Sequence, residues 1–587
     1  MKSLKTLLRY LGPYRKDMIT GALLVIIETG FELIIPILMA DLIDIGTAHH
    51  DISYILHKGG QMAICALLSL VTGLLYAKFA ARASYGWGSR IREAQFERVQ
   101  EFSFSNLDRF ETSSLITRMT TDVTILQNAV NGGFRPMVRG PVMLIFGLFL
   151  SFRMNTKLAF IFVFCAPVLG IILFYIVNKI APRYLLLQKA VDKLNNTVQE
   201  SLTAIRTVKA FVRGEYEQEK FDKVNKTMSE TSQDTFKYAV LNMPAFQLTL
   251  YTAIILIMWF GGNMIINSSL QVGELTGFLS YVFQIMNSMM MISNVFLLLS
   301  RSLSSAQRIS EVLDEKIMLT SPENGETNIP AGSVCFENVS FKYKENAKAY
   351  ALSGVNLNIK EGQTVGIIGG TGSAKTTLVQ LIPRLYAATE GSVKVGGHDV
   401  REYDLKTLRD GVGIVLQKNV LFSGTIRENL LWGNPHADDE TIHEACRAAC
   451  VDDFISNLPQ GLDTMLEHGG VNVSGGQKQR ICIARTLLKH PKILIFDDST
   501  SAVDTATEAS IRKSLGNIRE MTKIIIAQRI SSVIETDQII VMNDGRVIAN
   551  GTHEQLLQNE PIYREIYESQ MRGDEFSAGK TNQLEKA

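Results

Sequence analysis

The chain has 587 residues, of which 46% are hydrophobic and 20% charged, and its formal net charge at pH 7 is +1. At roughly 100–200 residues per domain, this length predicts at least two domains. Because 59 basic residues are balanced by 58 acidic ones, the chain lacks the positive charge typical of nucleic-acid binders, and we expect no nucleic-acid partner. Long apolar stretches occur only before residue 317, and they exclude a wholly soluble enzyme.

Six apolar stretches are candidates for membrane-spanning helices, since a helix needs about 20 mainly apolar residues to cross a hydrocarbon core of about 30 Å. Lys and Arg concentrate in the connections after the second and the fourth stretch, which places both termini in the cytoplasm. We therefore expect a multi-pass protein of a cell membrane, in contact with membrane lipids. The compact chain shows no targeting segment, which favours a bacterial membrane. The predicted spans are 18–40, 60–80, 133–152, 158–178, 245–266 and 275–299, in a transmembrane domain of residues 1–317.

The two basic connections are about 50–65 residues long and keep an apolar period of 3.6 residues, which predicts helices. An out-and-back helical pair of this length extends about 40 Å beyond the bilayer. We expect these cytoplasmic extensions to contact the soluble half of the chain.

Glu28 and Glu32 lie four residues apart in the first span, and therefore on one face of its helix. A carboxylate within a membrane is costly and normally faces water or a partner. Two interpretations stay open: a polar patch in a substrate pathway, or a pair that is bonded to neighbouring helices.

The second half of the chain begins after a polar linker at 318–332 that contains two prolines and two glycines. We predict an α/β domain over 333–570, followed by a polar tail at 571–587. The fold class is thus an all-α six-helix transmembrane domain with long cytoplasmic helical extensions, followed by an α/β phosphate-loop domain that binds nucleotide.

The α/β domain opens with a phosphate-loop pattern. An apolar stretch, TVGII at 364–368, predicts a strand that leads into GGTGSAKTT and then a helix. In this pattern backbone N–H groups cradle phosphates, Lys375 reaches the terminal phosphates and Thr376 supplies a Mg²⁺ ligand. The residues that we expect to contact nucleotide are Gly370, Gly372, Ser373, Ala374, Lys375, Thr376 and Thr377.

Two further motifs belong to the same chemistry. The apolar strand ILIFDD predicts that Asp497 supports Mg²⁺ and that Asp498 lies where an attacking water is activated. A helix that begins with Ser474, Gly475, Gly476 and Gln477 predicts a second anion site, separate from the first.

From residue 1 to about 570 the chain resembles a half-transporter of the ATP-binding cassette (ABC) exporter family, of the multidrug or lipid type. The phosphate loop, VSGGQ, ILIFDD and the following Ser501–Asp504 occur in the order and spacing of that family. By this resemblance Gln417 belongs to a glutamine loop that approaches Mg²⁺ and the reacting phosphate, Tyr343 stacks on adenine, and Asp504 contributes to the nucleotide site.

The resemblance implies a dimer that binds ATP and Mg²⁺ between two cassettes. Each ATP lies between the phosphate loop of one subunit and the signature VSGGQ of the other, and closure turns the cavity between inward- and outward-facing states. The segments around 106–116 and 209–218 would contact the cassettes.

Three positions depart from the family pattern, all in one nucleotide site. Ala374 replaces the usual glycine, Asp498 replaces the usual glutamate, and Gln528 in A-Q-R replaces the usual histidine. A carboxylate that is one methylene shorter withdraws its oxygens by about 1.5 Å, and misplacement of about 1 Å can reduce a rate by about 100-fold. We expect a degenerate site in a heterodimer, in which the intact signature completes the competent site of a partner subunit.

The sequence favours an ATP-driven exporter of amphipathic compounds such as drugs, lipids or peptides. The alternative is a nucleotide-gated regulatory or channel subunit that does not pump, which the degenerate site would permit. A third interpretation, neutral drift in a working site, leaves both cassettes active. Transport against a gradient, coupled to ATP consumption, separates the exporter from the channel.

Overall fold

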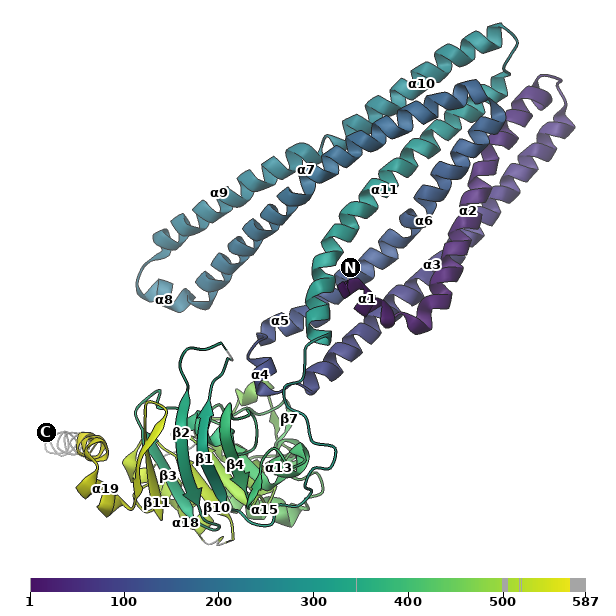
Figure 1. The fold of residues 1–587 in the computed structure, drawn as a ribbon. Coiled ribbons are helices and arrows are strands. Elements are labelled where there is room, and N and C mark those ends of the chain that lie inside the picture. Colours follow the sequence, from purple (N-terminus) through teal and green to yellow (C-terminus); the bar gives the residue numbers. More distant parts are fainter. Residues whose placement is uncertain (1, 345, 499–504, 517, 519, 571–587) are drawn as a thin grey trace. The chain divides into compact units, whose positions relative to one another are not determined.

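The computed structural model describes residues 2–344, 346–498, 505–516, 518 and 520–570. The chain divides into two compact units, which are described separately (Figure 1). The first unit comprises Met1–Glu101 and Phe110–Glu315, and the second comprises Phe102–Arg109 and Lys316–Ala587. The segment 106–116, which was expected to contact a cassette, is therefore divided: residues 106–109 belong to the second unit and residues 110–116 to the first.

The first unit is helical and, among the described residues, contains six helices that are long and apolar enough to cross a membrane. The predicted six-helix transmembrane fold is confirmed. The 49 residues of α3 and the 48 of α7 each extend about 70 Å at 1.5 Å per residue, so both continue well beyond a hydrocarbon core. The six helices contain α2 (Arg15–Asp41), α3 (Ile52–Gln100), α6 (Val123–Met154), α7 (Thr156–Thr203), α10 (Asn242–Ile266) and α11 (Val272–Leu313).

The first unit has further helices, of which α9 directly precedes α10 in the chain. These are α1 (Lys2–Arg9), α5 (Thr112–Thr117), α8 (Ile205–Ala210) and α9 (Gly214–Ala239), with π-helical turns at Leu42–Thr47 and Arg118–Asp122. Helices α7 and α9 run side by side (Figure 1), where Arg183 donates to Asp234 at 2.9 Å and lies over the Tyr238 ring. Within the spans, the buried Tyr281 hydroxyl donates to the Leu33 carbonyl at 2.7 Å and joins α11 to α2.

The second unit is built on a six-stranded sheet in the order β12-β11-β3-β10-β9-β6, in which all neighbours except β12 and β11 are parallel. The central strands β9 and β10 are buried along their whole length, and they contain continuous apolar runs, ILIF in β9 and III in β10, rather than alternating patterns. The edge strand β12 instead alternates exposed and half-buried residues. The strands are β3 (Thr364–Gly369), β6 (Val412–Val415), β9 (Ile493–Asp497), β10 (Thr522–Ile526), β11 (Gln538–Asn543) and β12 (Arg546–Gly551).

A smaller antiparallel sheet has the order β2-β1-β4-β5. It comprises β1 (Val334–Phe341), β2 (Leu352–Ile359), β4 (Glu390–Val395) and β5 (His398–Asp399), and a two-stranded pair is formed by β7 (Gly424–Thr425) and β8 (Met465–Leu466). The helices of the unit are α4 (Phe104–Leu107), α12 (Lys375–Gln380), α13 (Leu405–Gly411), α14 (Ile426–Leu431), α15 (Asp439–Ala448), α16 (Asp452–Ser456), α17 (Gly475–Leu487), α18 (Thr505–Gly516) and α19 (His553–Asn559).

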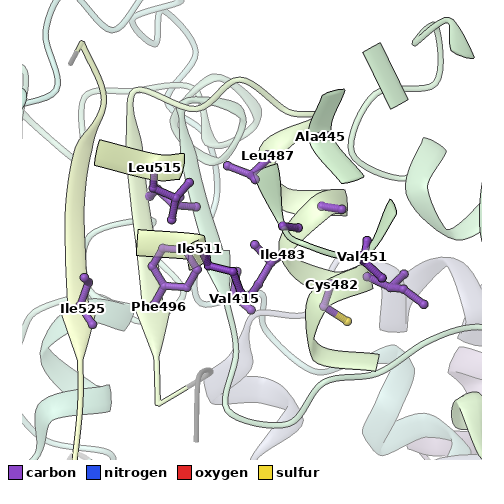
Figure 2. Packing of buried hydrophobic residues seen from close by; sticks show 14 of the residues in the cluster. Val415, Ala445, Val451, Cys482, Ile483, Leu487, Phe496, Ile511, Leu515 and Ile525 are labelled. Carbon is purple, nitrogen blue, oxygen red and sulfur yellow. The ribbon is translucent and has the colours of Figure 1, made fainter. Parts of the chain in front are cut away.

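The main core of this unit lies between the large sheet and its helices. Figure 2 shows Val415, Phe496 and Ile525 of three strands packed with side chains of α17 and α18. Burial of each large apolar side chain contributes about 1.5–3 kcal/mol. This packing fixes the strand ends, and with them the loops that follow β3, β9 and β10.

Candidate functional site

The phosphate-loop pattern forms a turn between β3 and α12. A Cβ atom built on Gly370 or on Gly372 would meet no heavy atom within 4 Å, so both glycines border open space. Gly372 has φ of +85°, a conformation that L side chains rarely adopt. The turn therefore leaves its backbone open to the cavity that it lines, as the binding of a phosphate group by backbone N–H groups requires.

Ala374 adopts an unfavourable backbone conformation at the start of α12. Its φ of 68° and ψ of 27° are left-handed, which costs an L residue about 1–2 kcal/mol. The position is one for which glycine is suited, and this explains why the usual residue there is glycine.

Replacing Ala374 by glycine is expected to stabilise the turn by about 0.5–1 kcal/mol. This is the difference between the left-handed strain and the larger entropy that glycine loses on folding, about 0.5–1 kcal/mol. Amide hydrogen exchange across residues 369–376 of the purified chain measures it. Ala388→Gly is the control, because Ala388 lies in a loop and does not itself have a positive φ, and this change should destabilise. A slower exchange in that variant too would contradict the strain argument.

Lys375, Asp497 and Asp498 are charged residues close to the turn. The Lys375 ammonium donates to the carbonyls of Gly369 and Gly370 at 2.9 Å each, and burial lowers its pKa although Asp498 and Asp497 act in the opposite direction. Burial raises the pKa of Asp497, partly offset by the hydroxyl of Thr376, which donates to it at 2.7 Å. The Lys375 amine, a group that can bind an anion, thus lies near the Thr376 hydroxyl and the Asp497 carboxylate. These two groups are oxygen ligands of the kind that Mg²⁺ prefers.

Asp498 accepts hydrogen bonds from two glutamines that the sequence alone did not predict. Its carboxylate accepts hydrogen bonds from Nε2 of Gln528, at 2.5 Å, and from Nε2 of Gln417, at 3.4 Å. Its φ of 50° is left-handed. Parallel pairing of β10 with β9 aligns Ile526 with Asp497, so the residues after both strands meet at one edge of the sheet.

These residues line one cavity of about 830 Å³. It includes the three positions that depart from the family pattern, Ala374, Asp498 and Gln528. Asp497 is buried beneath the cavity and reaches it through Thr376. Asp504 and its neighbours Ser501–Val503 lie outside the described residues. The other predicted residues at the cavity are Tyr343, Gly370, Gly372, Ser373, Lys375, Thr376, Thr377 and Gln417.

The signature residues Ser474–Gln477 are not among those that line this cavity. Ser474 caps α17: its hydroxyl accepts from the Gln477 amide at 3.3 Å, and its own amide donates to the Gln477 side chain at 2.8 Å. Ser474 and Gly475 are exposed. The capping box gives the helix start a fixed geometry, separate from the phosphate loop of the same chain.

Several cavity residues were missed from the sequence, among them Tyr350, Asp544, Gly545, Ile566 and Gln570. Gln570 donates to the Gln528 carbonyl at 2.8 Å and accepts from the Ile530 amide at 2.8 Å. These residues come from distant parts of the chain, and no local motif marks them.

A second polar site lies within the membrane-spanning helices. Glu28 and Glu32 of α2 are bonded to Arg135 and Arg139 of α6, respectively. Glu28 is buried, and Gly73 of α3 lies against it: a Cβ there would be 3.2 Å from its Oε1. Of the two interpretations, a polar patch in a substrate pathway or side chains bonded to neighbouring helices, the structure shows the second. The two arginines also line a cavity of about 500 Å³ together with Tyr76, Asn131 and Met291.

Comparison with known proteins gives a match in each half of the chain. Residues 18–289 match the model of the ABC transporter transmembrane region, and residues 352–501 match that of the ABC transporter. The uncharacterized ABC transporter ATP-binding protein YfiB of Bacillus subtilis is 37% identical over 566 residues, which are 96% of this chain and 98% of YfiB. The chain belongs to the ABC transporter family.

This ABC transporter is also similar to proteins whose names state what they transport. The ATP-dependent lipid A-core flippase of Desulfotalea psychrophila is 34% identical over 85% of this chain and 87% of its own length. The putative multidrug export ATP-binding/permease protein YgaD of Bacillus subtilis is 30% identical over 97% and 99% of the two chains. A bacterial Atm1-family ABC exporter with ATP bound has the same fold, with a TM-score of 0.78 and 24% identity over 95% of this chain and 98% of its own.

This ABC transporter is therefore a multi-pass membrane protein with the exporter fold. It combines transmembrane helices with an ATP-binding domain in one chain, as the family's ATP-coupled transport requires.

Proposed function

We propose that this chain is one subunit of a heterodimeric exporter in which its own nucleotide site holds ATP and Mg²⁺ but hydrolyses ATP slowly. Its signature residues Ser474–Gln477 complete the competent site of a second, different half-transporter. The division into a transmembrane domain at 1–317, a linker at 318–332 and a cassette at 333–570 is part of this proposal.

One observation carries the proposal. The three positions that depart from the family pattern lie around one cavity, and two of them, Asp498 and Gln528, are bonded to each other. An aspartate whose carboxylate is drawn to a glutamine amide is poorly placed to orient an attacking water, and glutamine is never positively charged. Neutral substitutions would be spread over all the nucleotide motifs. Here the three substitutions lie at one cavity, and the signature residues are unchanged.

The remaining site residues fit ATP binding. Lys375 would bind the terminal phosphates, and Thr376, Asp497 and Gln417 supply oxygen ligands suited to Mg²⁺. Tyr343 is 48% exposed and lines the cavity, so its ring is accessible to adenine. Mg²⁺, when bound, would neutralise charge on the phosphates.

The transported compound is proposed to be amphipathic, a drug, a lipid or a peptide. Support comes from the named cargo of the relatives and from the cavity beside Arg135 and Arg139 within the spans. Such a cavity offers apolar walls with a few polar groups, which is the usual composition of a ligand site.

The test is vanadate trapping with photoreactive 8-azido-ATP on the complex that contains the tagged chain, isolated from its native membrane. We expect label on the second subunit and little on this chain. The chain purified alone and reconstituted in vesicles should hydrolyse ATP slowly. Label mainly on the Lys375 loop, or rapid hydrolysis with uphill transport by the chain alone, would contradict the proposal.

A further inference from the structure

The short helix α4 is held in the second unit by two sets of contacts. Asn106, which is buried, donates to the Lys316 carbonyl at 2.8 Å and accepts from the Met318 amide at 3.3 Å. The second set is made by Tyr386: its hydroxyl donates to Asp108 at 2.7 Å, and its ring meets that of Phe104 edge to face at 5.9 Å. Tyr386 thus contacts both ends of α4, Phe104 at its start and Asp108 directly after it.

The same tyrosine contacts the residue that is proposed to stack on adenine. The rings of Tyr343 and Tyr386 are 5.4 Å apart at 85°, and Phe341 contacts both, at 4.9 Å and 5.5 Å. The Tyr343 hydroxyl shares a hydrogen bond of 2.7 Å with Thr377 of the phosphate loop. A continuous set of contacts therefore runs from the nucleotide cavity through Tyr343 and Tyr386 to α4.

We propose that Tyr386 is the positioning residue that makes the docking of α4 sensitive to adenine bound against Tyr343. Tyr386 is 6% exposed, so its ring is confined by packing and a change in the Tyr343 ring alters the Tyr386 ring directly. Adenine stacked on Tyr343 fixes that ring, the fixed ring restrains Tyr386, and the Tyr386 hydroxyl holds Asp108.

A nucleotide site that binds ATP but hydrolyses it slowly would in this way still act on α4. Along the chain, α4 lies between α3, which ends at Gln100, and α5, which begins at Thr112. Binding of ATP, without hydrolysis, would thus reach two helices of the transmembrane unit through the chain itself. The inference needs only nucleotide binding and holds whether or not the chain forms a heterodimer.

The experiment is amide hydrogen exchange over residues 103–110 of the purified full chain in lipid nanodiscs, with Mg²⁺ and either ATP or tripolyphosphate. In the unmodified chain we expect ATP to slow exchange about tenfold, the effect of strengthening one hydrogen bond to a charged group. Tripolyphosphate occupies the phosphate loop but has no base, and it should change exchange less than about twofold.

Tyr386→Phe keeps the ring and removes the hydroxyl. In this variant we expect the ATP effect on α4 to fall below about twofold, while the Kd for a fluorescent ATP analogue changes by less than about twofold. Hydrogen exchange and the Kd respond differently because they report different states. Exchange reports the rare state in which α4 is undocked, whereas the Kd is set by the majority of molecules, in which α4 is docked. A purely structural role for Tyr386 would speed exchange equally with and without ATP.

Matched variants test the same connection from its other end. Asp108→Ala removes the acceptor and should act like Tyr386→Phe, with no added effect in the double variant. Asp108→Asn keeps an acceptor oxygen but loses the charge, and it should retain a smaller response. Tyr403→Phe removes another buried hydroxyl of the unit, bonded to the Val395 carbonyl at 2.8 Å, and should leave the response unchanged. A response that survives in Tyr386→Phe, that tripolyphosphate reproduces, or that is absent from the unmodified chain would overturn the proposal.

Discussion

Replacing Asp498 by glutamate and Gln528 by histidine in the same chain is expected to raise ATP hydrolysis by the purified protein about 100-fold. The added methylene moves the carboxylate oxygens by about 1.5 Å towards the position of an attacking water, and a 1 Å correction of a reacting group is worth about 100-fold. Histidine supplies a group that can carry positive charge near the terminal phosphate, which glutamine cannot. Phosphate release at saturating Mg²⁺ and ATP measures the gain.

The single change Asp498→Glu should restore little. Gln528 and Gln417 both donate to the carboxylate of Asp498, and a glutamate in its place would still be held by two amides. Because these three side chains interact directly, we expect the effect of the double variant to exceed the product of the two single effects.

Asp544→Glu is a matched control for this prediction. Asp544 lines the same cavity and also has a left-handed φ, of 46°, but it follows β11 and is not bonded to either glutamine. Its replacement tests whether an extra methylene in the cavity changes hydrolysis by itself, and we expect no gain. A full gain from Asp498→Glu alone, or none from the double variant, would show that the bond between Asp498 and Gln528 does not limit the rate.

The sequence was sufficient wherever the relevant physics is local. The six apolar stretches specify helices because each is long enough to cross a membrane, and the turn before Lys375 needs only its own glycines and the strand that precedes it. Thr376 and Asp497 were predicted to act together, and they are bonded at 2.7 Å. Whether they hold Mg²⁺ stays a prediction.

The sequence was insufficient where strand order or helix pairing decides the contacts. Gln528 meets Asp498 only because β10 lies beside β9 in the sheet, and the two residues are 30 positions apart. Glu28 and Arg135 are 107 positions apart, and nothing local to either predicts the pair. The contacts that hold α4 in the cassette unit are likewise distant in sequence: Asn106 is bonded to Lys316, 210 positions away, and Asp108 to Tyr386, 278 positions away.

Replacing Arg135 by methionine is expected to destabilise the transmembrane unit by about 3–5 kcal/mol, the usual effect of breaking a buried ion pair. The side chain of Glu28 is only 3% exposed, whereas that of Arg135 is 40% exposed and lines a cavity. Loss of the arginine thus leaves a buried carboxylate without its partner, and one of the Glu28 oxygens already has no hydrogen-bond partner among the described residues. The thermal unfolding midpoint in lipid nanodiscs measures the loss.

The reverse change, Glu28→Leu, should cost less, because the Arg135 that remains can turn towards its cavity. The double variant Glu28→Leu, Arg135→Met removes both charges together and should recover most of the stability. Arg139→Met is the matched control one helical turn away: the Glu32 side chain there is 24% exposed, so its carboxylate is less buried than that of Glu28 and we expect a loss of about 1 kcal/mol. Equal losses at Arg135 and Arg139 would mean that burial of the carboxylate does not set the strength of these pairs, and a double variant no more stable than Arg135→Met would mean that the charge left behind is not what destabilises the helices.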